Sequence, residues 1–341
     1  MIQNSSSRNY LTKDLGNTLR ILQLNIEGVS RPKSDCLTKI LTENKVDVVL
    51  LQETHCSDQS QLNTRCKIPG FTLAAATYHP KYGTATYIKN DITTVTHIRT
   101  QSDNNIYVIR LKVADTEIIN VYKPPAQPWI NDYIHNIEHP GLVIGDFNSQ
   151  NTKWGDRATN DDGARVSDWA ETENLFLLFD AKDKGTFHSA RWAQDYNPDL
   201  CFTTLDSKGL PLHSSREVLS GFPRSQHRPV LINIGLQIPI VRSIPKPRWY
   251  FQKANLEEFS EELDFNIQWI PPEPASYERF VGLIHSIAKK HVPRGFRKDY
   301  IPGWSPRCQE LYDDFQSTQD SDVADELILA LDSARKRNGA P

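Results

Sequence analysis

Alternating apolar runs across residues 19–237 constrain the fold of this chain more than any other feature of its sequence. The runs are rich in Val, Ile, Leu, Thr and Tyr and are separated by turn-forming residues, which is typical of β-strands. They occupy residues 19–26, 46–53, 84–90, 106–113, 117–122, 142–147, 200–205 and 229–234. Wholly apolar stretches such as VVLL predict strands buried on both faces, whereas TATYIKN and IYVIRLKV predict half-exposed strands.

Only two segments of this region have the spacing of a helix. One follows Ser34 or Asp35, either of which is an expected cap, and the other covers residues 163–175. Many strands with few helices favour stacked sheets covered by helices. The predicted fold class is therefore an α/β or α+β sandwich.

The character of the sequence changes after Gln237. Prolines at 239, 245 and 247 predict a linker, and amphipathic patterns at 256–263, 276–290 and 323–337 predict helices beyond it. We therefore expect a flexible N-terminus over residues 1–17, a main domain over residues 18–238, and a linker with a helical extension over residues 239–341.

The charge balance excludes one class of nucleic-acid binder. The chain has 39 Lys and Arg against 42 Asp and Glu, a net charge of −3, whereas a protein that coats DNA carries a basic excess. An enzyme that brings a metal ion to a phosphodiester stays possible, because such a site needs carboxylates. The net charge predicts weak general DNA affinity unless basic residues cluster on one face; the candidates for such a cluster are Lys81, Lys89, Lys123, Lys153, Arg157 and Arg165.

Cellular context follows from cysteine usage and hydropathy. The 5 cysteines are odd in number and scattered, which disfavours a disulfide framework or a closed zinc site. No apolar stretch approaches the length of a membrane-spanning helix, and the first residues do not resemble a signal peptide. We expect an intracellular protein with no membrane partner.

Polar side chains lie at the ends of the predicted strands. They are Asn25, Glu53, Tyr122, Asp146, Asn148, Asp199 and His227. Each one alone is more often a solvated strand end, a turn residue or an exposed imidazole. Together they suit one task, because carboxylate and amide oxygens bind Mg²⁺, an Asp–His pair holds an imidazolium against a phosphate, and an Asp–Asn pair positions a water.

The order of short motifs resembles the endonuclease/exonuclease/phosphatase superfamily, and within it the apurinic-type endonuclease domain of non-LTR retrotransposons. The motifs are LNIEG at 24–28, QET at 52–54, NVYKPP at 120–125, GDFNS at 145–149, WG at 154–155, TFHS at 186–189, PDL at 198–200 and SQHRP at 225–229. The tail, with PRGFRKDYIPGWSP, resembles the segment that leads to a reverse transcriptase in those elements. The resemblance covers residues 19–237 and implies a chain truncated before that polymerase.

The resemblance implies a four-layered sandwich of two mostly antiparallel β-sheets flanked by helices, with the helical extension following it. It implies Mg²⁺ as the cofactor, with Mn²⁺ as a substitute, bound by Glu53 and by Asn25. No small-molecule cofactor is expected. The implied partner is DNA, joined in a full-length relative by the element RNA or the reverse transcriptase, and this substrate places the protein in the nucleus, with the cytoplasm as the alternative.

The same resemblance assigns roles to the remaining residues. Asp146 would orient or deprotonate the attacking water, and Asn148 would fix that water in place. His227 would stabilise charge at the scissile phosphate while Asp199 holds its ring. The residues expected to contact the phosphate group itself are Tyr122, Asn148 and Thr186.

One position departs from the family pattern. The chain has Ser225-Gln226-His227 where the family has Ser-Asp-His, so a carboxylate is missing beside the metal and the water. Either Gln226 is a working variant, which the match at the other positions favours, or this copy is disabled. The leading hypothesis is a Mg²⁺-dependent endonuclease that nicks DNA and leaves a 3′-hydroxyl for retrotransposition. The alternatives are a catalytically dead or domesticated remnant that binds DNA or a partner, and another phosphoesterase of the superfamily.

Overall fold

The computed structural model describes residues 11–103, 106–242, 248–295, 299–318 and 320–337 of the 341-residue chain. Residues 14–236 form one compact unit, and the chain from residue 237 belongs to a second. Among the described residues, no helix is long and apolar enough to cross a membrane.

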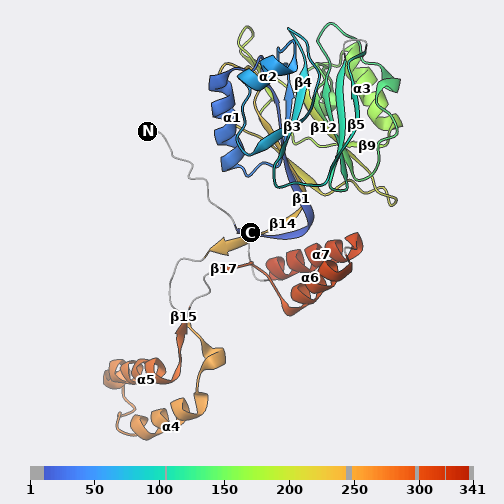
Figure 1. Cartoon of the computed structure of the whole chain (residues 1–341). Coiled ribbons are helices and arrows are strands. Elements are labelled where there is room, and N and C mark those ends of the chain that lie inside the picture. Colours follow the sequence, from blue (N-terminus) through green and yellow to red (C-terminus); the bar gives the residue numbers. More distant parts are fainter. Residues whose placement is uncertain (1–10, 104–105, 243–247, 296–298, 319, 338–341) are drawn as a thin grey trace. The chain divides into compact units, whose positions relative to one another are not determined.

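The larger unit contains two β-sheets (Figure 1). The first runs in the order β13-β14-β1-β2-β4-β3, and β17 pairs with residues 241–242 of β14, beyond residue 236 and therefore in the second unit. Its strands are β1 (Leu11–Asn25), β2 (Val48–Gln52), β3 (Phe71–Ala76), β4 (Thr84–Lys89), β13 (Ser214–Val218), β14 (Val230–Arg242) and β17 (Asp299–Tyr300). β1 and β2 are parallel, whereas β4 pairs antiparallel with both β2 and β3.

The second sheet runs in the order β5-β6-β7-β8-β12-β9. Its strands are β5 (Val95–Gln101), β6 (Tyr107–Val113), β7 (Thr116–Tyr122), β8 (Gly141–Asp146), β9 (Leu175–Leu177) and β12 (Asp199–Thr204). Only β7 and β8 are parallel neighbours among these strands. A separate hairpin consists of β10 (Phe187–Ser189) and β11 (Gln194–Tyr196).

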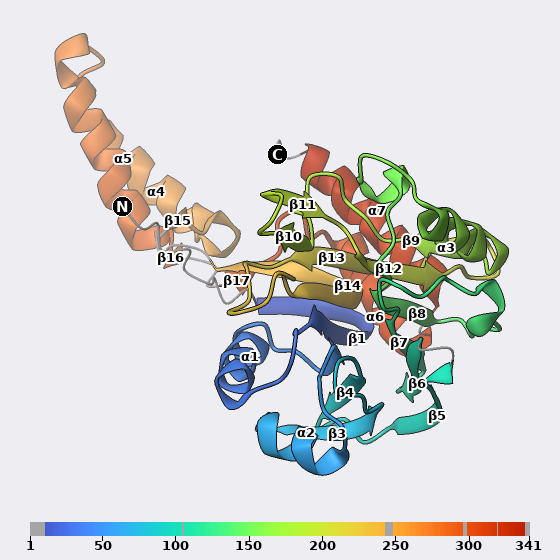
Figure 2. The ribbon, with the colours of Figure 1, turned by 90° about the horizontal axis from the view of Figure 1, so that it is seen from above.

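Helices cover the outer faces of the two sheets. Figure 2 shows α1 (Arg31–Glu43) and α2 (Gln59–Arg65) beside the first sheet, and α3 (Asp161–Thr172) beside the second. This arrangement confirms the predicted four-layered sandwich. Short 3₁₀ turns occupy Asn131–Tyr133 and Thr152–Trp154.

The start of α1 differs from the expectation. Ser30 occupies the N-cap position without a side-chain hydrogen bond to the helix, and Pro32 lies in the first turn, where a missing N–H costs no hydrogen bond. Ser34, an expected cap, lies inside the helix, and its hydroxyl donates to the Lys67 carbonyl. Asp35 is likewise inside the helix, so the cap prediction was wrong by about one turn.

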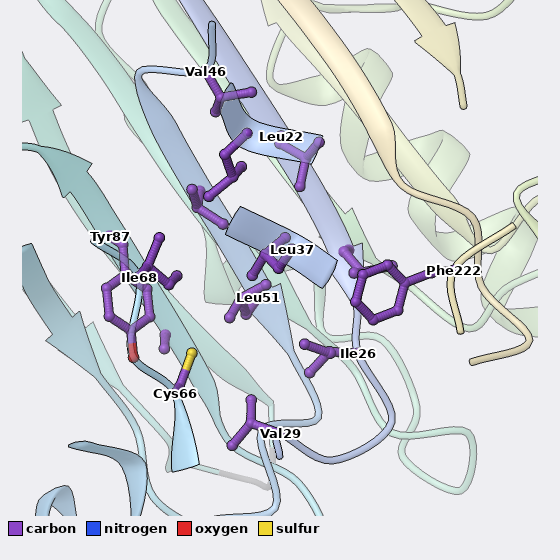
Figure 3. Close-up of a cluster of buried hydrophobic side chains, with 14 of the residues drawn as sticks. Leu22, Ile26, Val29, Leu37, Val46, Leu51, Cys66, Ile68, Tyr87 and Phe222 are labelled. Carbon is purple, nitrogen blue, oxygen red and sulfur yellow. The ribbon is translucent and has the colours of Figure 1, made fainter. Parts of the chain in front are cut away.

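Three apolar clusters fill the spaces between the layers. Successive residues of β2 alternate between two of them, with Val48 and Leu50 between the sheets and Val49 and Leu51 under α1. Figure 3 shows the cluster beneath α1, where Leu37 meets the side chains of the first sheet. The third cluster packs the second sheet against α3. The predicted burial of VVLL on both faces is confirmed.

Two strands are more buried than the sequence indicated. β4 and β6 were expected to be half-exposed, but most of their side chains are buried. β4 lies between β2 and β3, and β6 lies between β5 and β7. Threonine and tyrosine side chains on interior strands are covered by neighbours that the pattern of one strand does not reveal.

The segment after residue 237 contains the predicted helices and further elements. It comprises β15 (Arg248–Trp249), the 3₁₀ turn Phe251–Lys253, α4 (Leu256–Ile267), the 3₁₀ turn Pro274–Ser276, α5 (Tyr277–His291), β16 (Arg294–Gly295), α6 (Pro306–Thr318) and α7 (Ser321–Arg337). The helical extension is therefore confirmed, although the start of the expected linker, residues 239–242, continues β14. Residues 243–247 lie outside the described residues.

The N-terminal expectation also needs correction. Residues 11–17 were assigned to a flexible terminus, but they form the first half of β1. The long strand β14 is the neighbour of β1 in the sheet. Backbone hydrogen bonds between neighbouring strands form at polar residues as readily as at apolar ones, so a polar segment can be part of a strand. Residues 1–10 lie outside the described residues.

Candidate active site

The strand register brings most of the predicted site residues to one edge of the sandwich. Asn25 ends β1, and Glu53 directly follows the parallel strand β2. In the second sheet Tyr122, at the end of β7, is the register partner of Asp146 at the end of β8. Asp146 is in turn opposite Asp199, the first residue of β12. Residues that are far apart in the sequence therefore meet because their strands end together.

Close backbone approach and left-handed residues shape this edge. A Cβ atom at Gly145 would lie 1.8 Å from the Val121 carbonyl oxygen, so only glycine allows β8 to pass β7 here. Glu27, Glu53 and Asn148 have φ angles of 47°, 51° and 44°, which are unfavourable for residues with side chains. All three lie within two residues of the end of a strand, where the left-handed conformation changes the direction of the chain.

Asp146, His227 and Asp199 form a buried cluster at this edge. His227 Nδ1 lies 2.8 Å from Asp199 Oδ2, and its Nε2 lies 3.9 Å from Asp146 Oδ2. Asn25 Nδ2 donates to the same Asp146 oxygen over 2.8 Å. All four side chains are buried. Because a single imidazole lies close to two carboxylates, the cluster has an excess of negative charge when both carboxylates are ionised.

Burial and neighbouring charges set the protonation of this cluster. Burial alone would lower the pKa of His227, but the charge and hydrogen bond of Asp199, followed by the charge of Asp146, raise it to about 9. Burial and the charge of Asp199 raise the pKa of Asp146 to about 7, against the lowering effect of His227. The cluster therefore combines a cationic imidazole with a carboxylate that can accept a proton near neutral pH.

Glu53 lies in a second, more open part of the same edge. Tyr122 Oη donates to its Oε1 over 2.7 Å, and His55 Nε2 lies 3.3 Å from its Oε2. Burial would raise the pKa of Glu53, but hydrogen bonds from His55, Tyr122 and Asn25 outweigh it and lower that pKa. Burial, reinforced by the Glu53 charge, raises the pKa of Tyr122. Glu53 is thus held ionised and Tyr122 is held as a hydrogen-bond donor.

The two remaining predicted residues lie beside the cluster. The Asn148 backbone N–H donates to Asp146 Oδ1 over 2.9 Å, and its side-chain amide donates to the Lys123 carbonyl. Thr186 is buried, and its hydroxyl accepts the Asp199 backbone N–H over 3.3 Å. The structure therefore brings Thr186 to Asp199, and its contact with a phosphate stays a prediction.

Gln226, the departure from the family pattern, is exposed and faces the β10–β11 hairpin. Its Oε1 accepts the Ala190 backbone N–H over 3.1 Å. Its backbone N–H donates over 3.0 Å to the carboxylate of Glu27, and the Glu27 charge helps to raise the pKa of His227. A carboxylate is therefore present next to this loop although position 226 has none.

Several residues of the site were not predicted from the sequence. Glu27 lies in the LNIEG motif, two residues beyond the end of β1, but no role was predicted for it. Gln23, Gln52 and Asn120 are buried amides in contact with the cluster or with one another. The available signal was an amide inside an apolar run, as in ILQLNI and INVY. Such a residue needs buried hydrogen-bond partners, which the sequence does not identify.

One predicted DNA contact was wrong. The Lys123 side chain is 0% exposed, and its Nζ lies 2.9 Å from Asp162 Oδ2. It also donates to the Gln127 carbonyl. Lys123 is a structural cation that joins the loop after β7 to the first turn of α3, so it is not available to a phosphate backbone.

The donor set fits a hard divalent cation. Within the described part of the chain, ligand atoms of Asp146, Asp199 and His227 all lie within 4.8 Å of one another. Asp199 and His227 already bond each other, so the oxygens of Asp146 and of the ionised Glu53, with Asn25 between them, are the more available donors. Oxygen donors of this kind suit Mg²⁺, and a cation would also neutralise the repulsion between the buried carboxylates.

Residues 22–207 match the Endonuclease/Exonuclease/phosphatase family. This match covers more than half of the chain, and the chain therefore belongs to that family, as the order of its motifs predicted.

Two curated proteins of Drosophila melanogaster are similar to this chain. It is 28% identical over 201 residues to the RNA-directed DNA polymerase from mobile element jockey, covering 55% of this chain and 20% of that protein. It is 27% identical over 262 residues to the probable RNA-directed DNA polymerase from transposon X-element, covering 72% of this chain and 27% of that protein. The chain thus spans about a fifth to a quarter of the length of these relatives.

Solved structures agree with the fold. The endonuclease domain of TRAS1, a telomere-specific non-LTR retrotransposon, superposes with a TM-score of 0.51 at 19% identity, over 64% of this chain and 99% of that domain. The AP endonuclease LMAP from Leishmania major also gives a TM-score of 0.51, at 13% identity, over 69% of this chain and 96% of that one. Together with the curated relatives, these similarities confirm the predicted resemblance to retrotransposon endonucleases.

Proposed function

We propose that this chain is a Mg²⁺-dependent DNA endonuclease that nicks one strand and leaves a 3′-hydroxyl. The observation that carries the proposal is the pairing, at one edge of the sandwich, of the ionised Glu53 with the buried Asp146–His227–Asp199 cluster. Phosphodiester hydrolysis needs stabilisation of charge and an aligned water more than it needs a covalent nucleophile. This edge combines acceptors for a water proton with a cationic donor.

The proposed reaction assigns a role to each of these side chains. A bound Mg²⁺, held by Glu53 with Asn25, would supply charge neutralisation at the phosphate oxygens. Asp146 accepts a proton from the attacking water, and Asn148 helps to hold that water. The new bond forms between this water oxygen and phosphorus while the bond from phosphorus to O3′ breaks. The leaving O3′ takes a proton from solvent, so the products are a 5′-phosphate and a 3′-hydroxyl.

The cationic His227 hydrogen-bonds to a phosphate oxygen and stabilises its developing charge, with Asp199 holding the ring. Tyr122 keeps its proton and donates to the phosphate group, and Thr186 supports both Asp199 and the phosphate. The same substrate leads us to propose a nuclear protein. In a longer chain like the relatives, the 3′-hydroxyl would prime reverse transcription of an element RNA.

The test is nicking of supercoiled plasmid by purified protein. We expect nicked circles with Mg²⁺ or Mn²⁺ and none after chelation, with ligatable 3′-hydroxyl ends. Changing Glu53 to alanine should raise the Mg²⁺ concentration for half-maximal nicking by at least about tenfold, because altering even the surroundings of a metal ligand costs about 10- to 100-fold in affinity. A wild-type protein that leaves the plasmid intact, or nicks it equally well in chelator, would refute the proposal.

A second candidate, a remnant that binds DNA without cutting it, is favoured by one observation, the missing carboxylate at position 226. We expect the working-variant interpretation to hold, because Gln226 is exposed and its side chain bonds Ala190. Changing Gln226 to alanine should lower kcat for nicking by less than about tenfold, since a neutral hydrogen bond contributes about 0.5–1.5 kcal/mol. Changing Gln226 to aspartate should likewise change kcat for nicking by less than about tenfold.

The Gln226 variants also separate the two candidates. A silent wild type together with an active Gln226→Asp protein would identify a disabled nuclease with an intact fold. If both are silent but still retard a DNA duplex in a gel, the binding remnant is the better description. Release of phosphate from inositol phosphates or from free DNA ends, with plasmid left intact, would instead identify another phosphoesterase.

A further inference from the structure

A chain of buried amides runs from the catalytic cluster into the space between the two sheets. Gln23 Nε2 donates to Asp199 Oδ1 over 2.7 Å and to Gln52 Oε1 over 2.8 Å. Gln52 Nε2 donates in turn to Asn120 Oδ1 over 2.7 Å. The three amides and the carboxylate are at most 1% exposed.

The amide chain connects strands of both sheets. Gln23 lies on β1 and Gln52 ends β2, whereas Asn120 lies on β7 and Asp199 begins β12. The Asn120 amide nitrogen has three further acceptors, the carbonyls of Leu51 and Ala85 and the hydroxyl of Thr86. The far end of the chain is therefore anchored in the first sheet, and no amide in the chain is left to rotate freely.

The direction of these hydrogen bonds is fixed by the carboxylate of Asp199 at one end of the amide chain. An ionised carboxylate only accepts hydrogen bonds, so Gln23 must present its nitrogen to Asp199. That orientation leaves the second hydrogen of the same nitrogen for Gln52 Oε1. Each amide thereby determines the orientation of the next, which is the condition for a buried polar network to be rigid.

Asp199 uses one oxygen for this network and the other for His227. Its Oδ1 accepts from Gln23 and its Oδ2 accepts from His227 Nδ1 at 2.8 Å. We propose that Gln23 is a positioning residue that orients His227 through Asp199, with Gln52 and Asn120 holding Gln23 in place. This inference rests on the proposed function, in which His227 contacts the scissile phosphate.

The reason is geometric. Without Gln23, Oδ1 of Asp199 would lose its side-chain donor at a residue that is only 1% exposed. The carboxylate could then rotate, which would weaken the hydrogen bond between its Oδ2 and His227 Nδ1. The His227 ring would then leave the orientation that aims Nε2 toward the phosphate. Misplacement of a reacting group by about 1 Å costs about 100-fold in rate, so the expected loss of kcat on removing Gln23 is about 10- to 100-fold.

The test uses Gln23→Met, which keeps the length of the side chain and removes its amide. We expect kcat for plasmid nicking to fall by about 10- to 100-fold while KM changes by less than about threefold. We also expect the low-field NMR resonance of the His227 Nδ1 proton, recorded without metal, to shift or broaden. The matched control is Leu24→Ala at the next position of the same strand, whose side chain belongs to the cluster beneath α1 and so lies on the opposite face of the strand from Gln23.

The control protein should melt at a lower temperature and keep both the resonance and kcat when it is assayed below its melting temperature. If Gln23→Met does not fold, Gln23→Asn replaces it, because the shorter amide stays polar but cannot reach Asp199. The inference is overturned if the proton resonance and kcat survive removal of the amide, or if Leu24→Ala changes them equally. A wild type that does not nick DNA would refute the proposed function, and the NMR comparison would still decide whether Gln23 orients His227.

Discussion

Changing Asp146 to asparagine is expected to lower kcat for nicking by about 10²- to 10⁴-fold, the range for removal of a general base. The melting temperature measured without metal should stay the same or rise. Asp146 is fully buried, and its carboxylate lies within 4.8 Å of ligand atoms of both Asp199 and His227. Removing one of two close, desolvated negative charges relieves repulsion that the folded protein otherwise tolerates for activity.

The matched control is Glu117→Gln, the same chemical change at another buried carboxylate. Glu117 lies at the start of β7, at the opposite end of the strand from Tyr122, where it pairs with Arg110. Its replacement should lower the melting temperature and leave kcat within about twofold, as expected for a residue remote from the chemistry. Nicking rates and melting curves of the two variants provide the comparison. Asp146→Asn with near wild-type kcat would remove Asp146 from the proposed role.

Much of this site could be predicted because strand ends carry functional side chains. The apolar runs located β7, β8 and β12, and the polar residues that bounded them were Tyr122, Asp146 and Asp199. Their convergence then follows from register, since Tyr122 pairs with Asp146 and Asp146 with Asp199. The order of the motifs indicated which of several strand-end residues belong to one candidate site, which the burial and chemistry of each residue alone do not indicate.

The contacts behind these residues could not be predicted from the sequence. Gln23 bonds Asp199 across 176 positions of sequence, and nothing in ILQLNI indicates which partner its amide has. The exposure of a strand also depends on its neighbours, so the alternation in TATYIKN was misleading for β4. Polar residues in apolar runs were the signal for a buried network, whereas its connectivity depends on how the two sheets pack.

The second large effect that we expect is a loss of stability when the buried Lys123 loses its anionic partner. Changing Asp162 to alanine is expected to lower the free energy of unfolding by about 3–5 kcal/mol, the cost of leaving a buried charge without its partner. The Lys123 ammonium is enclosed, and Asp162 is its anionic partner at 2.9 Å. Asp162 Oδ1 also accepts the Trp129 backbone N–H, a contact that the alanine variant loses. Urea denaturation followed by tryptophan fluorescence measures the change.

Two further variants separate the buried pair from ordinary surface charge. Arg165→Ala removes a half-exposed partner 3.9 Å from Asp162 and should change the free energy of unfolding by less than about 0.5 kcal/mol. The double variant Lys123→Met with Asp162→Leu should recover most of the lost stability, because an apolar pair avoids the desolvation cost of both charges. A loss below about 1 kcal/mol in Asp162→Ala would mean that water reaches the ammonium. Since the Lys123 carbonyl holds the Asn148 amide, the single variant should also nick DNA more slowly than the double variant does.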